Sequence, residues 1–528
     1  MCGIFGSINI DQENFEKSAL ESLHHRGPDD QGYIKDKNVI LGMTRLSIID
    51  LETGSQPISN QNEDIHLVCN GEIYNFIELK EELKEKVNFK TNSDVECILK
   101  LYELYSFDFI SKLRGMFSFA IYDARKSLIF IARDRLGIKP LYYYHHKDKF
   151  IFSSEIKAIL EYNSINASPN IKKMFPHNYF FMNLETHVNE INEQEPGTYS
   201  VININKNEIN KKTIKYWKTS LIENNDNENE VISNLEKKLD EATRIHLRSD
   251  VPVGLMLSGG VDSNIVGYFG KKNYNGKFNS FTFGNREKGL NEFEATDLTS
   301  KKIFNSTQRN VYLNFDDIFT TIPKVMRSLE VSEPRIFESS LATYLLMKEV
   351  KKHNKVILCG EGADELFGGY QGFFKDKSKM ELINEYKRHY FGGLYRLQLK
   401  RLDKITMAHS IEARVPILDH VFFEYASSIN INLRNKSGVL KYILRKMSEK
   451  YLPEEIAWRP KEQFTVGTGL TDYITDWISG ISEKALNSLP LRDLPKPKEK
   501  IWNQSHSNEN FTKYNKIVAN LFYFTFID

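Results

Sequence analysis

Short apolar runs separated by turn residues dominate residues 1 to about 160. These runs are rich in β-branched and aromatic side chains and are bounded by Gly, Asp or Lys, which is the pattern of β-strands. The predicted strands cover residues 2–10, 65–70, 116–123, 128–132 and 150–153. Helical spacing of apolar positions occurs between them, near residues 75–85 and 94–105. Such a mixture predicts an α+β sandwich rather than βαβ units.

A different pattern begins after a polar, Asn-rich stretch at residues 223–230. Residues 161–215 show little periodicity, and we place a linker at residues 216–230. Helical spacing then covers residues 232–245, and strand-like runs follow. These runs are residues 253–257, 278–283, 311–313 and 356–359. Strands separated by helices predict an α/β fold with a doubly wound parallel sheet, which binds ligands at the carboxyl ends of its strands. We therefore expect domains at 2–215 and 231–528, with a loosely ordered tail that ends in aromatic residues.

Composition and charge restrict the class of protein only moderately. Of the 528 residues, 41% are hydrophobic and 27% are charged, as in ordinary globular proteins. The formal net charge of +1 gives no global reason to expect a nucleic acid or an anionic membrane as a partner. No apolar run approaches the ~20 residues that span a bilayer, and no signal peptide is visible, so we expect a cytoplasmic protein. Four cysteines without a CxxC motif indicate neither a disulfide framework nor a zinc site.

The cysteine at position 2 is the first candidate for chemistry. Removal of Met1 would leave Cys2 as the N-terminal residue, and a free α-amine has a pKa of about 7.7–8.0. Such an amine can act as general base to the side chain of its own residue. Taken alone, however, Cys2 fits better as an ordinary residue at a frayed chain end.

Several blocks follow Cys2 in a fixed order. They are CGIFG at residues 2–6, HRGPD at 25–29, RLSIID at 45–50, NGEIYN at 70–75, and Asp94. Together they resemble the class II glutamine amidotransferases. The resemblance implies an N-terminal nucleophile (Ntn) fold for the sandwich and release of ammonia from glutamine. Considered singly, Arg45 fits a surface ion pair, and the Asn70-Gly71 pair fits an ordinary turn.

The same resemblance assigns roles to individual residues. Arg45 would bind the carboxylate of glutamine and Asp94 its α-amine, because a zwitterion needs one fixed cation and one fixed anion. The Asn70 side chain and the Gly71 backbone N–H would form the oxyanion hole for the tetrahedral intermediate. The other residues of the expected glutamine site are Leu46, Ser47, Ile48, Ile49 and Glu72.

A glycine-rich turn between a predicted strand and a predicted helix marks a second site. It reads SGGVDS and includes Ser258, Gly259, Gly260, Asp262 and Ser263. Such a turn presents backbone N–H groups at the positive end of a helix dipole, where phosphate binds. It is not a Walker loop, because the terminal GKS or GKT is absent. It is similar to the SGGxDS loop of the PP-loop ATP pyrophosphatases. The expected ligand is therefore ATP, and Asp262 would supply an oxygen for Mg²⁺.

A second acidic and glycine-rich block, GEGADELFGGY, covers residues 360–370 after a later strand. Alone it fits a solvated turn, but it resembles the signature of the asparagine synthetases. By that resemblance Asp364 is a second Mg²⁺ ligand, and Glu361 is the base that takes a proton from attacking ammonia. The adenine would lie against Met256, Phe283, Cys359 and Gly360.

Two later blocks extend this resemblance to about residue 464. Residues 401–403 (RLD) and 407–419 (MAHSIEARVPILD) carry charged side chains that are expected to form a wall of the site, although His409 fits a structural role equally well. The WRPKEQF block at 458–464 supplies Lys461, which by resemblance stabilises negative charge on phosphate as pyrophosphate leaves. Outside this motif a lone lysine is ordinarily solvated surface.

The resemblance as a whole implies that ammonia from glutamine is placed on an ATP-activated carboxylate. Glutamine, ATP and aspartate are the expected small-molecule partners, ammonia is expected to cross the protein interior, and family habit implies a homodimer. One departure affects the acceptor. Relatives carry DEP and then a Ser pair near Glu333, whereas residues 332–340 here read SEPRIFESS.

The alternatives are related enzymes and one silent protein. Another carboxylate, such as a sugar uronate or a peptide side chain, is the nearest alternative acceptor. A β-lactam synthetase is disfavoured because that branch has lost the glutaminase cysteine. A pure glutaminase joined to a sugar-phosphate domain would leave SGGVDS without a purpose. A silent binding protein predicts erosion of Cys2, Asp262, Asp364 or Lys461, and all four are intact.

Overall fold

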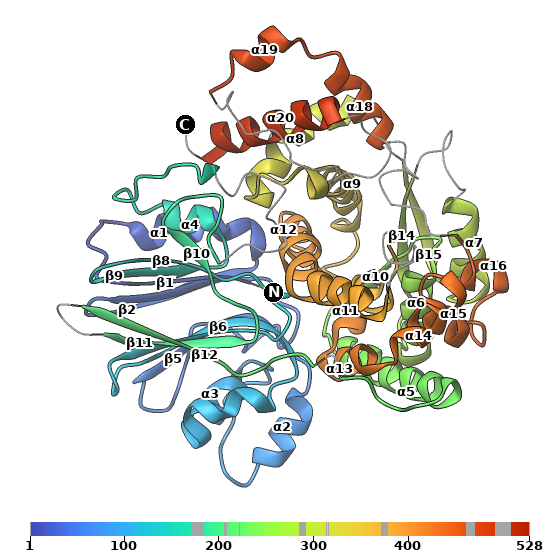
Figure 1. Ribbon diagram of the computed structural model, residues 1–528. Helices are drawn as coiled ribbons and strands as arrows, with labels where there is room; N and C mark the ends of the chain where they lie inside the picture. The colour runs from blue at the N-terminus through green and yellow to red at the C-terminus, as the bar shows by residue number, and fades with distance from the viewer. Residues whose placement is uncertain are drawn as a thin grey trace.

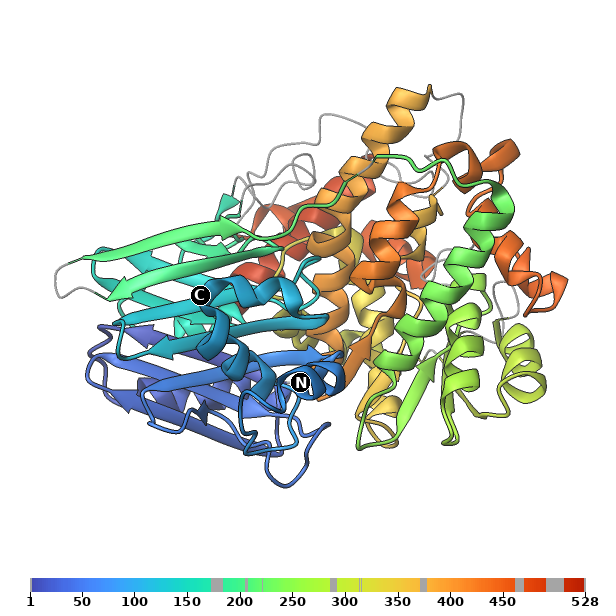
Figure 2. The same cartoon turned by 90° about the horizontal axis from the view of Figure 1, so that it is seen from below.

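Two bodies lie side by side in the computed structural model, with the N-terminus at their junction (Figure 1). The structure describes residues 2–171, 184–204, 208–220, 222–284, 292–312, 314, 316–370, 378–460, 470–490 and 508–526. Figure 2 gives the same arrangement from below, with the N-terminal strands on one side and a cluster of helices on the other. None of the helices in the described ranges is both long and apolar enough to cross a membrane.

The N-terminal body contains two antiparallel six-stranded sheets. The first has the order β10-β8-β9-β1-β3-β2 and the second the order β12-β11-β7-β6-β5-β4. The strands of the first sheet are β1 (Cys2–Ile8), β2 (Asp30–Asp36), β3 (Val39–Arg45), β8 (Tyr142–His146), β9 (Lys149–Ser153) and β10 (Ile191–Glu193). Those of the second are β4 (Ile58–Ser59), β5 (Ile65–Ile73), β6 (Gly115–Asp123), β7 (Leu128–Arg133), β11 (Thr198–Ile204) and β12 (Ile209–Lys215).

The two sheets pack face to face and carry helices on their outer faces (Figure 1). Ile4 and Met43 from the first sheet share a buried cluster with Val68 and Ile131 from the second. The first sheet is covered by α1 (Phe15–Leu23) and α4 (Ile156–Leu160), and the second by α2 (Phe76–Leu83) and α3 (Glu96–Tyr105). This body is an α+β sandwich, as predicted, and it has four layers because the central strands are apolar on both faces.

The C-terminal body is built on a parallel five-stranded sheet. Its strands are β13 (Val253–Met256), β14 (Asn279–Gly284), β15 (Thr307–Tyr312), β16 (Val356–Leu358) and β17 (Glu412–Arg414). Their order is β15-β14-β13-β16-β17, so the direction of strand addition reverses at β13. A reversal of this kind opens a crevice at the carboxyl ends of the strands, where α/β proteins bind ligands.

Helices account for most of the remaining C-terminal residues. They are α5 (Glu228–His246), α6 (Val261–Asn273), α7 (Glu292–Lys302), α8 (Asp316–Leu329), α9 (Pro334–Val350), α10 (Ala363–Phe367), α11 (Lys379–Arg388), α12 (Lys400–Met407), α13 (His420–Ser428), α14 (Ile431–Arg434), α15 (Tyr442–Ser448), α16 (Glu454–Ala457), α18 (Leu470–Ser479), α19 (Glu483–Asn487) and α20 (Asn508–Phe526). A π-helical segment, His389–Leu399, joins α11 to α12.

Several elements differ in extent from the sequence predictions. Residues 161–215 contain β10, β11 and β12, which were not predicted. The edge strand β12 reads INKKTIK, and its lysines mask the alternation of apolar and polar residues. The strand expected at 311–313 is the end of β15, and Leu313 lies outside the described residues. Helix α5 begins at Glu228, inside the predicted linker, because Asn227 and Glu230 form a capping box. The aromatic end of the chain is helix α20, which packs on α8.

Candidate active sites

Three strands meet around Cys2. Strand β1 pairs with β3 so that Cys2 lies opposite Arg45. On the facing sheet, β5 brings Asn70 close enough for its Oδ1 to accept a hydrogen bond from the Cys2 backbone N–H at 3.2 Å. The Cys2 side chain is buried. The fold thus joins two blocks of sequence that are 68 residues apart.

The predicted cation and anion of the glutamine site are both buried and fixed. The Arg45 guanidinium donates through Nη2 to the carbonyl oxygens of Ile49 (3.2 Å) and Asp50 (2.6 Å). The Asp94 carboxylate accepts from the Ile73 backbone N–H at 2.7 Å. The segment from Leu46 to Ile49 continues from Arg45 with its side chains buried.

The two candidate oxyanion donors are neighbours on β5. The Asn70 amide Nδ2 makes only long contacts, to Ser118 Oγ (3.5 Å) and Ser154 Oγ (3.4 Å), so its donor capacity is weakly used. Gly71 has φ +155°, and a Cβ built there would lie 2.1 Å from the Met116 carbonyl oxygen. Only glycine fits such a close approach of two strands.

The environment of Cys2 keeps its thiol protonated. Burial raises the pKa of the Cys2 thiol, and the positive charge at the chain start, the Leu46 backbone N–H and Arg45 oppose it. A buried thiol of this kind is a weak nucleophile until a neighbouring base takes its proton. The only amine that the sequence places on the nucleophile itself is the α-amine that Cys2 would carry without Met1.

The sequence analysis gave no role to Arg26, although it lies in the HRGPD block. Its guanidinium is fully buried and donates to the Cys2 carbonyl oxygen at 3.0 Å, to Glu155 at 2.7 Å and to Asp403 at 2.8 Å. Glu155 belongs to the N-terminal body and Asp403 to helix α12 of the C-terminal body. Arg26 therefore connects the Cys2 backbone to residues on both sides of the interface between the two bodies.

The SGGVDS turn lies at the carboxyl end of β13, beside the strand-order reversal. The Ser258 N–H donates to Ser263 Oγ at 3.0 Å, and Asn264 Nδ2 donates to the carbonyls of Ser258 and Gly260, both at 2.8 Å. These bonds lock the turn. The Gly259 N–H donates to the carboxylate of Glu292, so an anionic group already lies at this glycine-rich turn.

Asp262 and Asp364 share one cation. Lys441 Nζ lies 2.5 Å from Asp262 Oδ2 and 2.6 Å from Asp364 Oδ1, and the lysine is buried. The other oxygen of Asp262, Oδ1, is buried and has no hydrogen-bond partner in the part of the chain that the structure describes. Carboxylate oxygens that converge on one point suit Mg²⁺, which uses one or two carboxylates together with substrate phosphates. Lys441 was missed because no motif marks it in the sequence.

The candidate base follows β16 through Cys359 and Gly360. Arg401 Nη2 donates to Glu361 Oε2 at 3.1 Å, and Arg401 Nη1 donates to Thr343 Oγ1 at 2.9 Å. The Cys359 N–H donates to the Arg414 carbonyl at 3.0 Å, which fixes the strand end.

The residues predicted to contact adenine lie on neighbouring strands. Met256 ends β13, and Phe283 lies near the end of β14, which pairs with β13. Cys359 follows β16, on the other side of β13. Lys461 lies outside the described residues. In the unusual segment 332–340, Glu338 is buried and accepts from Thr471 Oγ1 at 3.0 Å, and burial raises the pKa of its carboxyl to about 7.

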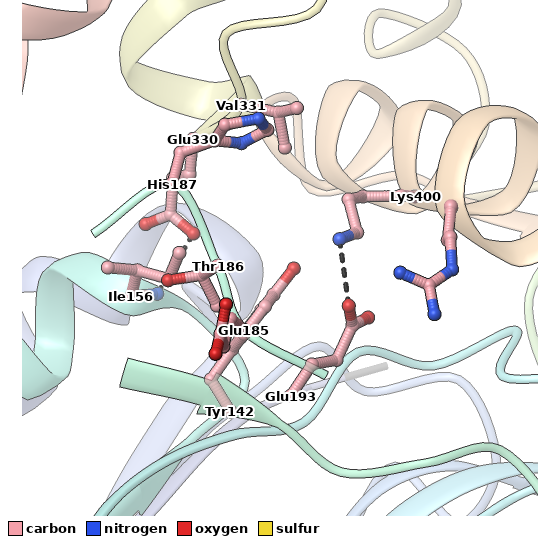
Figure 3. A pocket seen from close by; sticks show the side chains of 10 residues that line it. Tyr142, Ile156, Glu185, Thr186, His187, Glu193, Glu330, Val331 and Lys400 are labelled. Atoms are coloured by element: carbon pink, nitrogen blue, oxygen red, sulfur yellow. Dashed lines mark hydrogen bonds and ion pairs between the residues drawn. The ribbon is translucent and has the colours of Figure 1, made fainter. Parts of the chain in front are cut away.

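A small polar cavity lies between the two bodies (Figure 3). Glu193 of β10 and Lys400 of α12 face each other across it, with Oε2 and Nζ 3.0 Å apart. Its volume of about 20 Å³ holds roughly one water molecule. None of the residues around it belongs to the glutamine or ATP candidates, so this cavity lies outside both sites.

Comparison with known proteins gives the same two parts in the same order. A glutamine amidotransferase domain matches residues 1–217, and an asparagine synthase domain matches residues 234–393 and 390–520. The glutamine-hydrolysing asparagine synthetase 1 of Bacillus subtilis is 31% identical, over 92% of this chain and 90% of the relative. Asparagine synthetase B of Escherichia coli is 31% identical over 99% and 91%. A putative asparagine synthetase of Methanocaldococcus jannaschii is 36% identical over 70% and 76%. The chain belongs to the family of glutamine-hydrolysing asparagine synthetases.

Proposed function

We propose that this protein makes asparagine from aspartate, with ATP as the activating substrate and glutamine as the ammonia donor. The observation that carries the proposal is the junction of Asp262 and Asp364 around one cation, beside the Arg401–Glu361 pair. The same chain contains a buried Cys2, whose backbone N–H donates a hydrogen bond to the Asn70 side chain. The products are asparagine, glutamate, AMP and pyrophosphate.

The first reaction is glutamine hydrolysis at Cys2. Arg45 binds the glutamine carboxylate, and Asp94 and Glu72 face its α-ammonium group. The Cys2 sulfur attacks the side-chain amide carbon, and its proton passes to the α-amine. The Asn70 amide and the Gly71 N–H stabilise the oxyanion, ammonia leaves, and water hydrolyses the glutamyl thioester. The segment from Leu46 to Ile49 forms the wall beside the substrate.

The second reaction activates and amidates the acceptor. The Ser258–Ser263 turn binds the phosphates, and Met256, Phe283, Cys359 and Gly360 contact the adenine. A carboxylate oxygen of aspartate attacks the α-phosphorus and pyrophosphate leaves. Ammonia then attacks the acyl carbon, Glu361 takes a proton from it, and AMP leaves.

Four charged side chains act on the charge of the phosphates. Mg²⁺, held by Asp262 and Asp364, would neutralise charge on the phosphates. Lys441, which pairs with both carboxylates, would give up these contacts to a bound metal ion, and Lys461 stabilises the departing pyrophosphate.

The finer description of the fold belongs to the same proposal. We assign residues 2–215 to an Ntn-type glutaminase domain, 216–230 to the connection and 231–528 to a doubly wound synthetase domain. The four-layer sandwich and the reversal of strand order at β13 support this division.

The test compares the intact protein with Cys2→Ala. Pyrophosphate release from ATP–Mg²⁺ is measured with glutamine or with ammonium, with and without aspartate, and asparagine is quantified. In the intact protein we expect aspartate-dependent pyrophosphate release with either nitrogen donor. In Cys2→Ala we expect the glutamine-driven reaction to fall at least 1,000-fold and the ammonium-driven reaction to remain. Glutamine hydrolysis without aspartate-dependent pyrophosphate would contradict aspartate as the acceptor and point to another carboxylate.

A further inference from the structure

Arg414 crosses from the synthetase body to the glutamine site. It ends strand β17 and is fully buried. Its Nη2 lies 3.3 Å from Glu72 Oε2, which follows the oxyanion residues Asn70 and Gly71 on β5. The ring of Tyr74, two residues further along, lies 5.6 Å from the guanidinium carbon. The C-terminal half of the chain thus supplies a cation to the end of the glutamine-site strand.

Two carbonyl oxygens and one carboxylate accept hydrogen bonds from the Arg414 guanidinium. Nη1 donates to the carbonyl oxygens of His246 (2.7 Å) and Arg248 (2.6 Å), at the end of helix α5. Nε donates to the Glu412 carboxylate. Among the described residues, neither Nη2 nor Glu72 Oε2 has a hydrogen-bond partner, so the two groups meet as an ion pair, and the carboxylate retains capacity to accept a donor. Five donors in a rigid fork allow one arginine to make all these contacts.

Two other buried carboxyl groups lie close enough to Glu72 to affect it, and the charge of Arg414 opposes theirs. Asp94 and Glu412 also act on Glu72, and all three carboxyl groups are almost completely buried. Burial, followed by Glu412 and Asp94, raises the pKa of Glu72 well above its ordinary value, whereas Arg414 opposes the shift. Arg414 therefore offsets part of the unfavourable environment of the Glu72 carboxyl group and fixes its position.

We propose that Arg414 is a positioning residue of the glutamine site, which holds the Glu72 side chain in place and orients its carboxyl group toward the α-ammonium group of glutamine. The inference rests on the proposed glutaminase activity and extends it, because one residue of the site comes from the synthetase domain. The Arg414 carbonyl also accepts the Cys359 N–H at 3.0 Å. The same residue therefore fixes a strand end of the ATP site and a carboxylate of the glutamine site.

The test measures glutamate release from glutamine by the full-length protein without ATP or acceptor. Arg414→Met should raise the KM for glutamine at least tenfold and lower kcat less than threefold, because the lost contact concerns binding. Arg414→Lys should recover part of the KM. The matched control is Arg434→Met, since Arg434 is also buried but donates to Tyr390 and Ile429, which do not belong to the glutamine site. It should leave the KM for glutamine unchanged.

A double-mutant cycle with Glu72→Gln separates positioning from general support of the fold. If Arg414 acts through Glu72, Glu72→Gln should raise the KM for glutamine at least tenfold in the natural chain. In the Arg414→Met background the same substitution should raise it less than threefold. The inference would be overturned if the effects of the two substitutions on the KM for glutamine were fully additive. It would also be overturned if Arg414→Met left this KM unchanged, or if Arg434→Met raised it equally. If Arg414→Met does not fold, Arg414→Lys replaces it in the cycle. An intact protein that releases no glutamate would contradict the proposed function instead, and the assay does not depend on the acceptor.

Discussion

At the scale of single residues, burial decides how Cys2 must react. Burial raises the pKa of its thiol, and the positive chain start only partly opposes this. The thiol therefore remains protonated at neutral pH, and the base form of the α-amine has to accept its proton. We expect kcat/KM for glutamine hydrolysis to rise with pH and to level off above the amine pKa of about 7.7–8.0. Glutamate release from pH 6 to 10 measures this, and an inflection above pH 9 would mean that the thiol ionises unaided.

Lys441 lies between the two carboxylates that we propose as Mg²⁺ ligands. Its ammonium lies between Asp262 and Asp364, so without nucleotide it competes with a divalent cation. In Lys441→Met the two carboxylates lose their cation, and we expect Mg²⁺ alone to stabilise the variant. At ten times its Kd the gain is about 1.4 kcal/mol.

Thermal unfolding at increasing MgCl₂ without ATP measures the effect of Lys441. The exposed Lys450, which pairs with Glu236 on the surface, provides the control Lys450→Met. An equal rise in Tm with Mg²⁺ in the intact protein, in Lys441→Met and in Lys450→Met would mean that Lys441 does not compete with a metal ion.

At the scale of elements, Glu330 joins helices from the two bodies. It lies just after α8, accepts the N–H groups of Ile156 and Lys157 at the start of α4, both at 2.9 Å, and pairs with Lys404 of α12. Both Glu330 and Lys404 are buried. Glu330→Ala leaves a buried ammonium without its partner, so we expect the free energy of unfolding to fall by about 3–5 kcal/mol.

Urea denaturation measures that loss, and adding Lys404→Met to Glu330→Ala should recover part of it. Glu81→Ala removes an exposed i,i+3 pair with Lys84 and should change stability by less than about 0.5 kcal/mol. A Glu330→Ala effect as small as the Glu81→Ala effect would contradict the assignment of Glu330 as a buried link between the two bodies.

At the scale of the whole molecule, buried ion pairs make the two bodies respond together to acid. Burial raises the pKa of Glu193, but Lys400 and Arg133 more than offset it and hold that pKa at about 2. Burial also lowers the pKa of Lys400 to about 8, with Glu193 opposing, so Lys400 stays protonated throughout the acidic range. Because the pKa of Glu193 is depressed on folding, its contribution is present above about pH 4.5 and is lost as pH falls toward 2.

Glu193→Gln should therefore be less stable than the intact protein at pH 7, and the difference should shrink steadily below pH 4.5. Its upper value is about 3 kcal/mol, from a shift of roughly 2.5 pH units. Thermal unfolding from pH 3 to 7 measures it, with Glu195→Gln as control, because the Glu195–Lys215 pair is exposed. A difference between Glu193→Gln and the intact protein that does not change with pH would contradict the depressed pKa.

Strong local patterns made much of the fold predictable. Apolar β-branched runs gave β5, β6 and β7, and the Gly-rich turn after β13 was visible because glycine and serine punctuate it. The edge strand β12 and the three-residue strand β17 escaped, because lysines break the alternation in the first and Glu412 and Arg414 form the ends of the second. Strand β17 exists because β16 pairs with it, which no window of its own sequence reveals.

The sequence by itself determined which chemical groups are present: a cysteine at position 2, the glycine-rich turn at residues 258–263 and the acidic, glycine-rich block at 360–370. The order of the motifs is also enough to predict two domains. Tertiary structure alone decided that Lys441 lies between Asp262 and Asp364, that Arg26 reaches both Cys2 and Asp403, and that Arg414 faces Glu72. The physical reason is that such pairs join residues from 24 to 377 positions apart. Their contact is set by how sheets and helices pack and by the need of buried charges for partners, and neither leaves a local pattern in the chain.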